Sequence, residues 1–208
     1  MFTSADQDRA QELLGAIQFF SQKGWSPATS TNYSVRSTNS ENFILSRSGV
    51  DKSLFRMEDF LLLDSKGSIL KAQVPGAKPS AETDIHLALY DLFPEIGCVL
   101  HTHSVLGTVL SRTHAKEGAV HFEGWEILKG LEGNTTHAMS AKLPIVPNSQ
   151  DMADIVKAMK LFLRGARDPH GFLIEGHGLY TWGKDVASAK RHIETYEFLF
   201  ECLDRLRR

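Results

Sequence analysis

Apolar positions in the first third of the chain predict one helix followed by short strands. Between residues 5 and 22, apolar side chains recur at three- and four-residue intervals, which is typical of one face of an α-helix. Gly24, just beyond, is a typical stop signal. The alternating or short apolar runs that follow predict strands at 33–36, 42–46, 60–64 and 69–73, with a turn at 65–67 between the last two.

The remainder of the chain alternates helical and extended patterns. Ser80 is a candidate N-cap for a helix that ends at Pro94, and Asp185 is a candidate cap for a last helix through Leu206. Between them, we expect strands at 97–103, 119–123, 143–146, 172–174 and 179–182, and helical segments at 104–113, 124–131 and 151–164. These elements predict a single domain, residues 1–208, with a three-layer α/β fold in which helices flank a central, mainly antiparallel sheet.

Composition and charge exclude several classes of protein. With 42% hydrophobic and 23% charged residues, the 208-residue chain has enough apolar material for a substantial core. The net charge of -2 and the lack of a clustered basic face argue against a nucleic-acid partner. No apolar stretch approaches the ~20 residues of a membrane helix, and the first residues lack the pattern of a signal peptide. Cys98 and Cys202 are expected to be buried thiols rather than a disulfide, which favours the cytoplasm.

Three histidines are the best candidates for chemistry. His101 and His103 end an apolar strand, and alternate residues of a strand point to the same side. Two imidazoles on one face could bind a metal such as zinc, or could be a hydrogen-bonded pair in the core. His177 lies between Gly176 and Gly178, which allow a close approach of the backbone. It could be a third ligand or an exposed side chain in a tight hairpin.

Three neutral imidazoles would leave a bound metal with its full charge and an open position. That arrangement favours a catalytic Lewis acid over a structural site, which more often uses cysteines and is closed. The other six histidines are expected to be packing, surface or solvated residues, one of which could still touch a substrate: His86, His114, His121, His137, His170 and His192.

Several separated motifs resemble one known family. They are Lys78-Pro79-Ser80-Ala81-Glu82, His86 with Tyr90, His101-Thr102-His103-Ser104 and Gly176-His177-Gly178. Together, from about residue 8 to the C-terminus, they resemble the class II aldolase/adducin family. The resemblance implies a class II aldolase-like fold and a Zn²⁺ ion held by His101, His103 and His177. It also implies a homotetramer with active sites between subunits.

Within that family, residues 123–130 and 177–183 resemble the dehydratases of methionine salvage. This resemblance implies a zinc-dependent lyase that converts 5-methylthioribulose 1-phosphate to 2,3-diketo-5-methylthiopentyl 1-phosphate. One alternative is a sugar-phosphate aldolase or epimerase on the same zinc scaffold. A second alternative is a non-catalytic, adducin-like binding domain, although adducin-type domains lack the three histidines.

Dehydration requires a base for the C3 proton and an acid for the departing C4 hydroxyl. Glu126 matches the acid/base glutamate proposed for the dehydratases, and Glu82 matches the general base of the aldolases. Without the resemblance, Glu126 could be an exposed carboxylate on a short helix, and Glu82 a first-turn carboxylate favoured by the helix dipole. We predict that Glu126 serves the dehydration step. Glu82 is expected near the zinc, as a second base or as a ligand when substrate is absent.

The phosphate group of the substrate requires hydrogen-bond donors. Hydroxyl-rich loops and helix N-termini bind phosphate readily, although such loops are often ordinary turns. Five residues fall on phosphate-binding positions of the aldolase relatives: Thr29, Asn32, Ser48, Gly49 and Ser80. Ala81 stands where sugar-phosphate aldolases commonly have a hydroxyl residue, which removes one donor. The expected partner is therefore a small sugar phosphate, with neither nucleic acid nor membrane involved.

Overall fold

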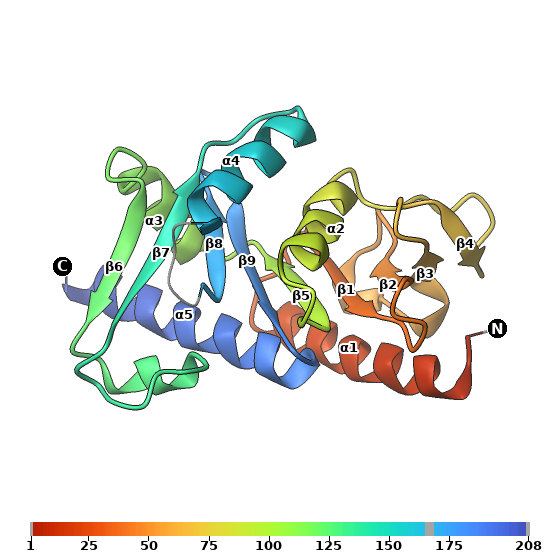
Figure 1. Ribbon diagram of the computed structural model, residues 1–208, viewed down its shortest axis with the longest axis horizontal. Helices are drawn as coiled ribbons and strands as arrows, with labels where there is room; N and C mark the ends of the chain where they lie inside the picture. The colour runs from red at the N-terminus through yellow and green to blue at the C-terminus, as the bar shows by residue number, and fades with distance from the viewer. Residues whose placement is uncertain (1, 165–168, 207–208) are drawn as a thin grey trace.

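A nine-stranded sheet runs through the part of the chain that the computed structural model describes, residues 2–164 and 169–206 (Figure 1). The strand order is β4-β3-β2-β1-β5-β9-β8-β7-β6. The strands are β1 (Asn32–Arg36), β2 (Phe43–Ser46), β3 (Phe60–Leu63), β4 (Ile69–Ala72), β5 (Cys98–Thr102), β6 (Ala119–Glu123), β7 (Ser140–Val146), β8 (Gly171–Ile174) and β9 (Gly178–Gly183). Only β7 and β8 pair in parallel among these strands, so the expected mainly antiparallel sheet is confirmed.

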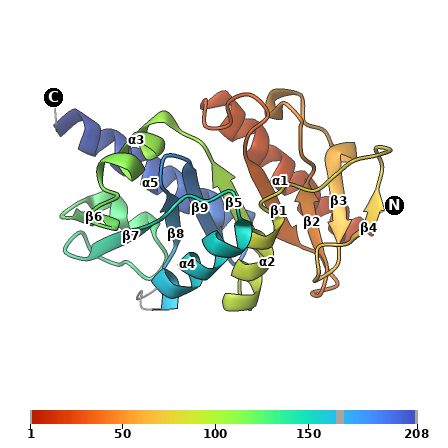
Figure 2. The same cartoon turned by 90° about the horizontal axis from the view of Figure 1, so that it is seen from above.

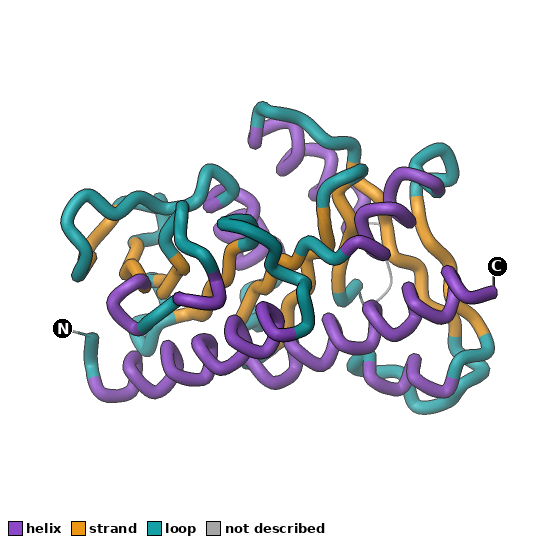
Figure 3. The backbone as a smooth tube through the Cα atoms, turned by 180° about the vertical axis from the view of Figure 1, so that it is seen from behind, coloured by secondary structure: helices purple, strands orange, loops and turns teal. Residues whose placement is uncertain are grey.

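Helices cover both faces of the sheet, which confirms the predicted three-layer α/β architecture. They are α1 (Ser4–Gln22), α2 (Thr83–Leu92), α3 (Val105–Thr113), α4 (Met152–Arg164) and α5 (Val186–Leu206), with single turns η1 (Lys52–Leu54), η2 (Met57–Asp59) and η3 (Glu126–Gly130). Figure 2 shows α2 and α4 together on one face, where they pack against each other. The long helices α1 and α5 follow one another along the opposite face (Figures 1 and 3).

The central strand β5 separates two apolar cores. Cys98 and Leu100 point toward α1 and α5 and belong to the larger core, whereas Val99 belongs to the core under α2 and α4. Because successive side chains of a strand alternate between faces, His101 lies on the side of Val99. It is fully buried there.

One predicted helix start is wrong. The sequence indicated Ser80 as the N-cap of α2, but α2 begins at Thr83 and Glu82 occupies the cap position. The Ser80 hydroxyl accepts the backbone N–H of Glu82, and the Ser80 carbonyl accepts the N–H of Thr83. The chain therefore makes an additional turn before the helix. This turn directs the Glu82 carboxylate away from the helix end, where it makes no capping bond.

Other expectations are confirmed with small shifts. Asp185 accepts the backbone N–H of Ser188 at the start of α5, as an N-cap does. The strand predicted at 143–146 begins earlier, at Ser140. Cys98 and Cys202 are free thiols, as expected, and Cys98 is buried; the predicted burial of Cys202 is wrong, because that residue of α5 is partly exposed. Within residues 2–164 and 169–206, no helix combines the length and the apolar character needed to span a bilayer.

Candidate metal centre

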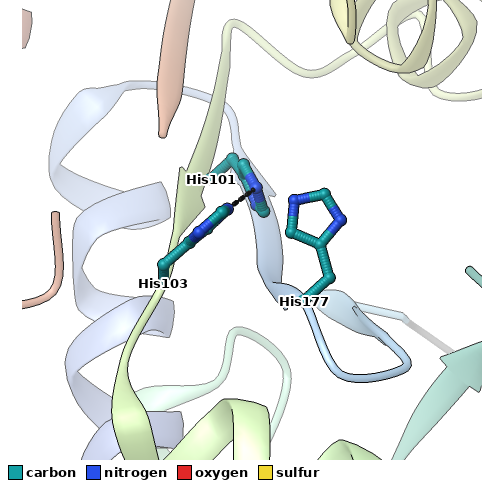
Figure 4. A group of neighbouring side chains, drawn as sticks. All are labelled: His101, His103 and His177. Carbon is teal, nitrogen blue, oxygen red and sulfur yellow. Dashed lines mark hydrogen bonds between the residues drawn. The ribbon is translucent and has the colours of Figure 1, made fainter. Parts of the chain in front are cut away.

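The imidazole rings of three histidines meet at the end of β5 (Figure 4). His101 is in β5, His103 is the first residue after β5, and His177 lies in the turn between β8 and β9. The centroids of the His101 and His103 rings, and those of the His103 and His177 rings, are 4.6 Å apart. The Nε2 atoms of His101 and His103 are 2.7 Å apart. One nitrogen from each ring lies within 4.8 Å of the other two, which is close enough to share one metal ion.

Two glycines allow the His177 turn to approach β5. Gly176 has a positive φ of 63°, a conformation that favours glycine. A Cβ atom on Gly178 would lie 2.2 Å from the Thr102 carbonyl oxygen and 2.8 Å from Cδ2 of His103. Any larger residue at position 178 would therefore force His177 and the β5 histidines apart.

The surroundings of His101 orient its ring, and burial keeps the rings of His101 and His103 neutral. His101 Nδ1 lies 3.0 Å from the Leu179 carbonyl, to which it donates, so Nε2 carries the lone pair that faces the other rings. The Tyr180 ring stacks on the His101 ring at a centroid distance of 4.0 Å. Burial lowers the pKa of His101 well below its usual value and that of His103 to about 4. A neutral imidazole with a free lone pair is the form that binds a metal, so these residues fit a divalent cation.

The Glu82 carboxylate completes the group. Its Oε1 is 3.1 Å from Nε2 of His177, and its Oε2 is 3.4 Å from Nε2 of His101. Oε2 also accepts hydrogen bonds of 2.6 Å from both the Asn32 amide and the Tyr180 hydroxyl. Burial opposes ionisation, but the electrostatic interaction with the His101 ring and the hydrogen bonds from His177, Tyr180 and Asn32 together hold the pKa of Glu82 well below its usual value. Glu82 therefore faces the histidines as a carboxylate.

The register of the sheet explains how these partners meet. Asn32 of β1 and Tyr180 of β9 lie directly opposite His101, one on each side of it. Directly opposed residues of antiparallel strands point to the same face, so the three side chains form a row across the sheet. His86 of α2 supports the far end of this row through Asn32 Oδ1 and the Ser34 hydroxyl. A sequence pattern singled out His101, and the family resemblance singled out Asn32 as a phosphate ligand, but neither gave a sign of the role of Tyr180.

A cavity of about 660 Å³ opens beside the histidines. Its floor includes Glu82, His103 and His177. The other described lining residues are Pro27, Ala81, Ser104, Val105, Thr108, Val109, Asn148, Ser149, Gln150, Met152 and Gly176. The 148–150 segment connects β7 to α4 and has no sequence motif, so nothing in the sequence marked it as part of the site.

Glu126 lies outside the described lining of the histidine cavity. It is on η3, its side chain is 70% exposed, and it pairs with Lys129 and, at 3.8 Å, with His137. These charged groups lower the pKa of the Glu126 carboxyl, the Lys129 hydrogen bond being the main cause. Glu126 is not among the described residues that line the histidine cavity. A single chain therefore does not bring it to the histidines.

Of the five candidate phosphate ligands, Asn32 and Ser80 belong to the hydrogen-bond network of Glu82. The Asn32 amide donates to the hydroxyl of Ser80 at 3.2 Å as well as to Glu82, so both residues are part of the Glu82 network. The Ser48 backbone N–H donates to the Lys78 carbonyl, which joins the 46–49 loop to the segment before α2. Gly49 has a positive φ of 76°, and Thr29 is exposed. None of the five belongs to the described lining of the cavity.

Comparison with known proteins gives a consistent result. The family model described as the Class II Aldolase and Adducin N-terminal domain matches residues 11–203. A protein of Stenotrophomonas maltophilia named methylthioribulose-1-phosphate dehydratase is 45% identical over 96% of this chain and 91% of its own length. A Picosynechococcus protein of the same name is 47% identical over 95% of this chain and 92% of its own.

Solved structures show the fold. The Escherichia coli protein YgbL superposes with a TM-score of 0.81 at 23% identity, over 97% of this chain and 90% of that one. The L-fuculose-1-phosphate aldolase of Thermus thermophilus gives a TM-score of 0.73 at 20% identity, over 97% of this chain and 96% of that one. These superpositions confirm the expected class II aldolase-like fold.

Proposed function

The chain belongs to the class II aldolase and adducin family, and from this we propose that it is a hydro-lyase of methionine salvage. Its substrate is 5-methylthioribulose 1-phosphate, and its product is 2,3-diketo-5-methylthiopentyl 1-phosphate. The observation that carries this proposal is the 45–47% identity, over more than nine-tenths of the chain, with relatives named for that reaction. The convergence of His101, His103 and His177 in this chain supports it.

We propose zinc as the metal, with His101, His103 and His177 as its ligands. Three nitrogen ligands with one further position are typical of catalytic zinc. When bound, zinc supplies Lewis-acid stabilisation of the negative charge that develops on substrate oxygens during proton removal. Glu82 faces the histidines as a fourth group, which suits a carboxylate that is a ligand in the resting protein and is displaced by substrate.

The acid and base are chain residues. Loss of the C3 proton and departure of the C4 hydroxyl with a second proton, as water, leave an enol between C3 and C4. Protonation of C4 with loss of the proton from the C3 hydroxyl then gives the 2,3-diketone. Glu82 is placed to accept a proton in the cavity, while its Asn32 and Tyr180 hydrogen bonds fix its orientation. We assign Glu126 to the proton transfers of dehydration.

Because Glu126 is remote from the cavity of its own chain, a second copy must supply it. The proposed homotetramer with active sites between subunits allows this. Around Glu126, the described surface presents partly exposed Trp125, Ile127 and Phe198, which are apolar side chains suited to an interface. In this arrangement the η3 turn of one copy lies over the histidine cavity of the next.

One assay tests the proposed reaction. Purified zinc-loaded protein is incubated with 5-methylthioribulose 1-phosphate, and the products are identified by mass spectrometry. A dehydratase gives one product lighter than the substrate by one water. An aldolase would instead break the C3–C4 bond and release dihydroxyacetone phosphate, and an epimerase would leave the mass unchanged. Either of the last two results would replace the proposal.

A mixing experiment tests the placement of Glu126. Glu126→Gln is expected to retain zinc but to lose dehydration, whereas Glu123→Gln, three residues away, is the control and is expected to stay active. Co-expression of Glu126→Gln with His177→Ala should restore roughly one quarter of the activity, since sites between subunits can combine both intact residues. A mixture that stays inactive would place Glu126 and His177 in sites of the same chain.

The remaining sequence-based expectations complete the proposal. They are a single domain over residues 1–208, a cytoplasmic location, and phosphate binding by Thr29, Asn32, Ser48, Gly49 and Ser80. The hydrogen bonds that join Asn32 and Ser80 to Glu82 support a phosphate position on that side of the histidines.

A further inference from the structure

The cavity beside the histidines has an apolar wall. Val105 and Val109 are one helical turn apart on α3, so their side chains share one face of that helix. They are 76% and 49% exposed, which is high for valines that line a cavity. Met152, the first residue of α4, lines the same cavity. Two helices thus place aliphatic and thioether groups beside His103 and His177.

The charges of this cavity do not suit a phosphate group. None of its described lining residues is a lysine or an arginine, and Glu82 is one of the residues that line it. The start of α4 already has acidic neighbours: Asp151 accepts the N–H of Ala153, and Asp154 lies in the first turn. At the start of α3, the Ser104 hydroxyl already accepts the N–H of Gly107. A dianion in this cavity would therefore meet acidic groups and no lysine or arginine side chain among the described lining residues.

The opposite side of Glu82 is polar. The Asn32 amide donates to the Glu82 carboxylate and to the Ser80 hydroxyl, and that hydroxyl also accepts the backbone N–H of Glu82. The Ser48 N–H donates to the Lys78 carbonyl in the segment that precedes Ser80. Glu82 and the histidines therefore lie between a polar region and an apolar-walled cavity. A substrate with a phosphate at C1 and a methylthio group at C5 has the same division along its length.

We infer that Val105, Val109 and Met152 form the subsite for the C5 methylthio group, and that the substrate lies with its phosphate toward Asn32 and Ser80. This inference rests on the proposed function, because it takes the methylthio group from the proposed substrate. Burying the methyl group and sulfur against three apolar side chains is favourable, and the sulfur of Met152 is a suitable soft neighbour. A C5 hydroxyl in the same position would lose its water without gaining a partner.

The test compares binding of two ligands that differ only at C5. Dissociation constants of 5-methylthioribulose 1-phosphate and ribulose 1-phosphate are measured by calorimetry on zinc-loaded protein, and every protein compared also carries Glu126→Gln so that it binds without turnover. Ribulose 1-phosphate lacks the methylthio group, and the loss of an apolar group of this size is expected to weaken binding at least tenfold. In Val105→Thr/Val109→Thr, which keeps side-chain shape but adds hydroxyls, the preference should fall severalfold. Met152→Gln should also lower the preference for 5-methylthioribulose 1-phosphate.

Leu161→Thr is the matched control, because Leu161 is as exposed as Val105 (76%) but lies on the α4 surface outside the described cavity lining. It should keep the full preference. The inference would be overturned if the preference for 5-methylthioribulose 1-phosphate over ribulose 1-phosphate were the same with and without the two valine substitutions. If the substitutions changed the oligomeric state and left this preference unchanged, the valines would instead belong to an interface. Product analysis of the wild type separately tests the proposed function, since ligand preference does not require turnover.

Discussion

Glu197 is a carboxyl group that the fold holds in an apolar environment. It lies on α5, is only 4% exposed, and its Oε1 has no hydrogen-bond partner among the described residues. Its other contact is a hydrogen bond with Ser104, which directly follows His103. Burial raises the pKa of Glu197 from 4.5 to about 8, and the Ser104 hydrogen bond opposes this only in part. The native protein therefore keeps this group protonated at neutral pH.

The raised pKa predicts how stability changes with pH. Between pH 4.5 and pH 8 the folded chain holds a proton on Glu197 that the unfolded chain has released, so the free energy of unfolding falls as pH rises through this window. At ~1.4 kcal/mol for each tenfold change in proton affinity, the full difference corresponds to about 5 kcal/mol. Local opening that lets water reach the carboxylate reduces this, so we expect a loss on the order of 2–3 kcal/mol.

Glu197→Gln isolates this effect, because glutamine keeps the size and the bond to Ser104 but cannot ionise. Urea unfolding is measured for both proteins at pH 5 and pH 8, at equal protein and metal concentrations. The stability of the variant relative to wild type should increase by about 2–3 kcal/mol from the lower to the higher pH. Glu194→Gln, on the same helix with a half-exposed carboxylate, should show no such trend. An identical pH dependence of wild type and Glu197→Gln would refute the reasoning.

Three further changes test the metal centre. His177→Ala removes one of three ligands and should reduce bound zinc at least tenfold, as measured by mass spectrometry of the metal after gel filtration. Gly178→Ala should lower both the melting temperature and the zinc content, because its Cβ would lie 2.2 Å from the Thr102 carbonyl; normal zinc binding would contradict the geometry. Tyr180→Phe removes the hydroxyl that orients Glu82 and should lower kcat about tenfold with zinc content unchanged; rates equal to wild type would exclude that role.

Local patterns singled out the three histidines as candidates, and the family resemblance added the prediction that they bind a metal. The alternation of a strand places His101 and His103 on one side, and glycines on both sides of His177 indicate a close approach. The structure brings all three together at the end of β5. Glu82 was expected near the histidines from the resemblance, and it lies there. The histidines lie in two short motifs, His101-Thr102-His103 and Gly176-His177-Gly178, in which the spacing along the chain directly determines the local geometry.

Contacts between distant segments could not be predicted in this way. The bond from Tyr180 to Glu82 spans 98 residues, and the 148–150 segment reaches the cavity only because β7 pairs with β8. The position of Glu126 illustrates a different limit. Resemblance of the 123–130 segment is the basis of the role proposed for Glu126, but one sequence does not specify how copies of the chain would bring Glu126 to a histidine cavity.

The register of three strands ties these separate segments into one site. Asn32, His101 and Tyr180 form one row because β1 and β9 both pair with β5 at the same level, and Glu82 lies against this row from the α2 side. A slip of one residue in either pairing would turn Asn32 or Tyr180 to the opposite face. The Glu82 carboxylate would then lose one of its two 2.6 Å hydrogen bonds while still facing buried histidines. The pairing that completes the sheet therefore also orients the carboxylate beside the three histidines, so fold and site are specified by the same hydrogen bonds.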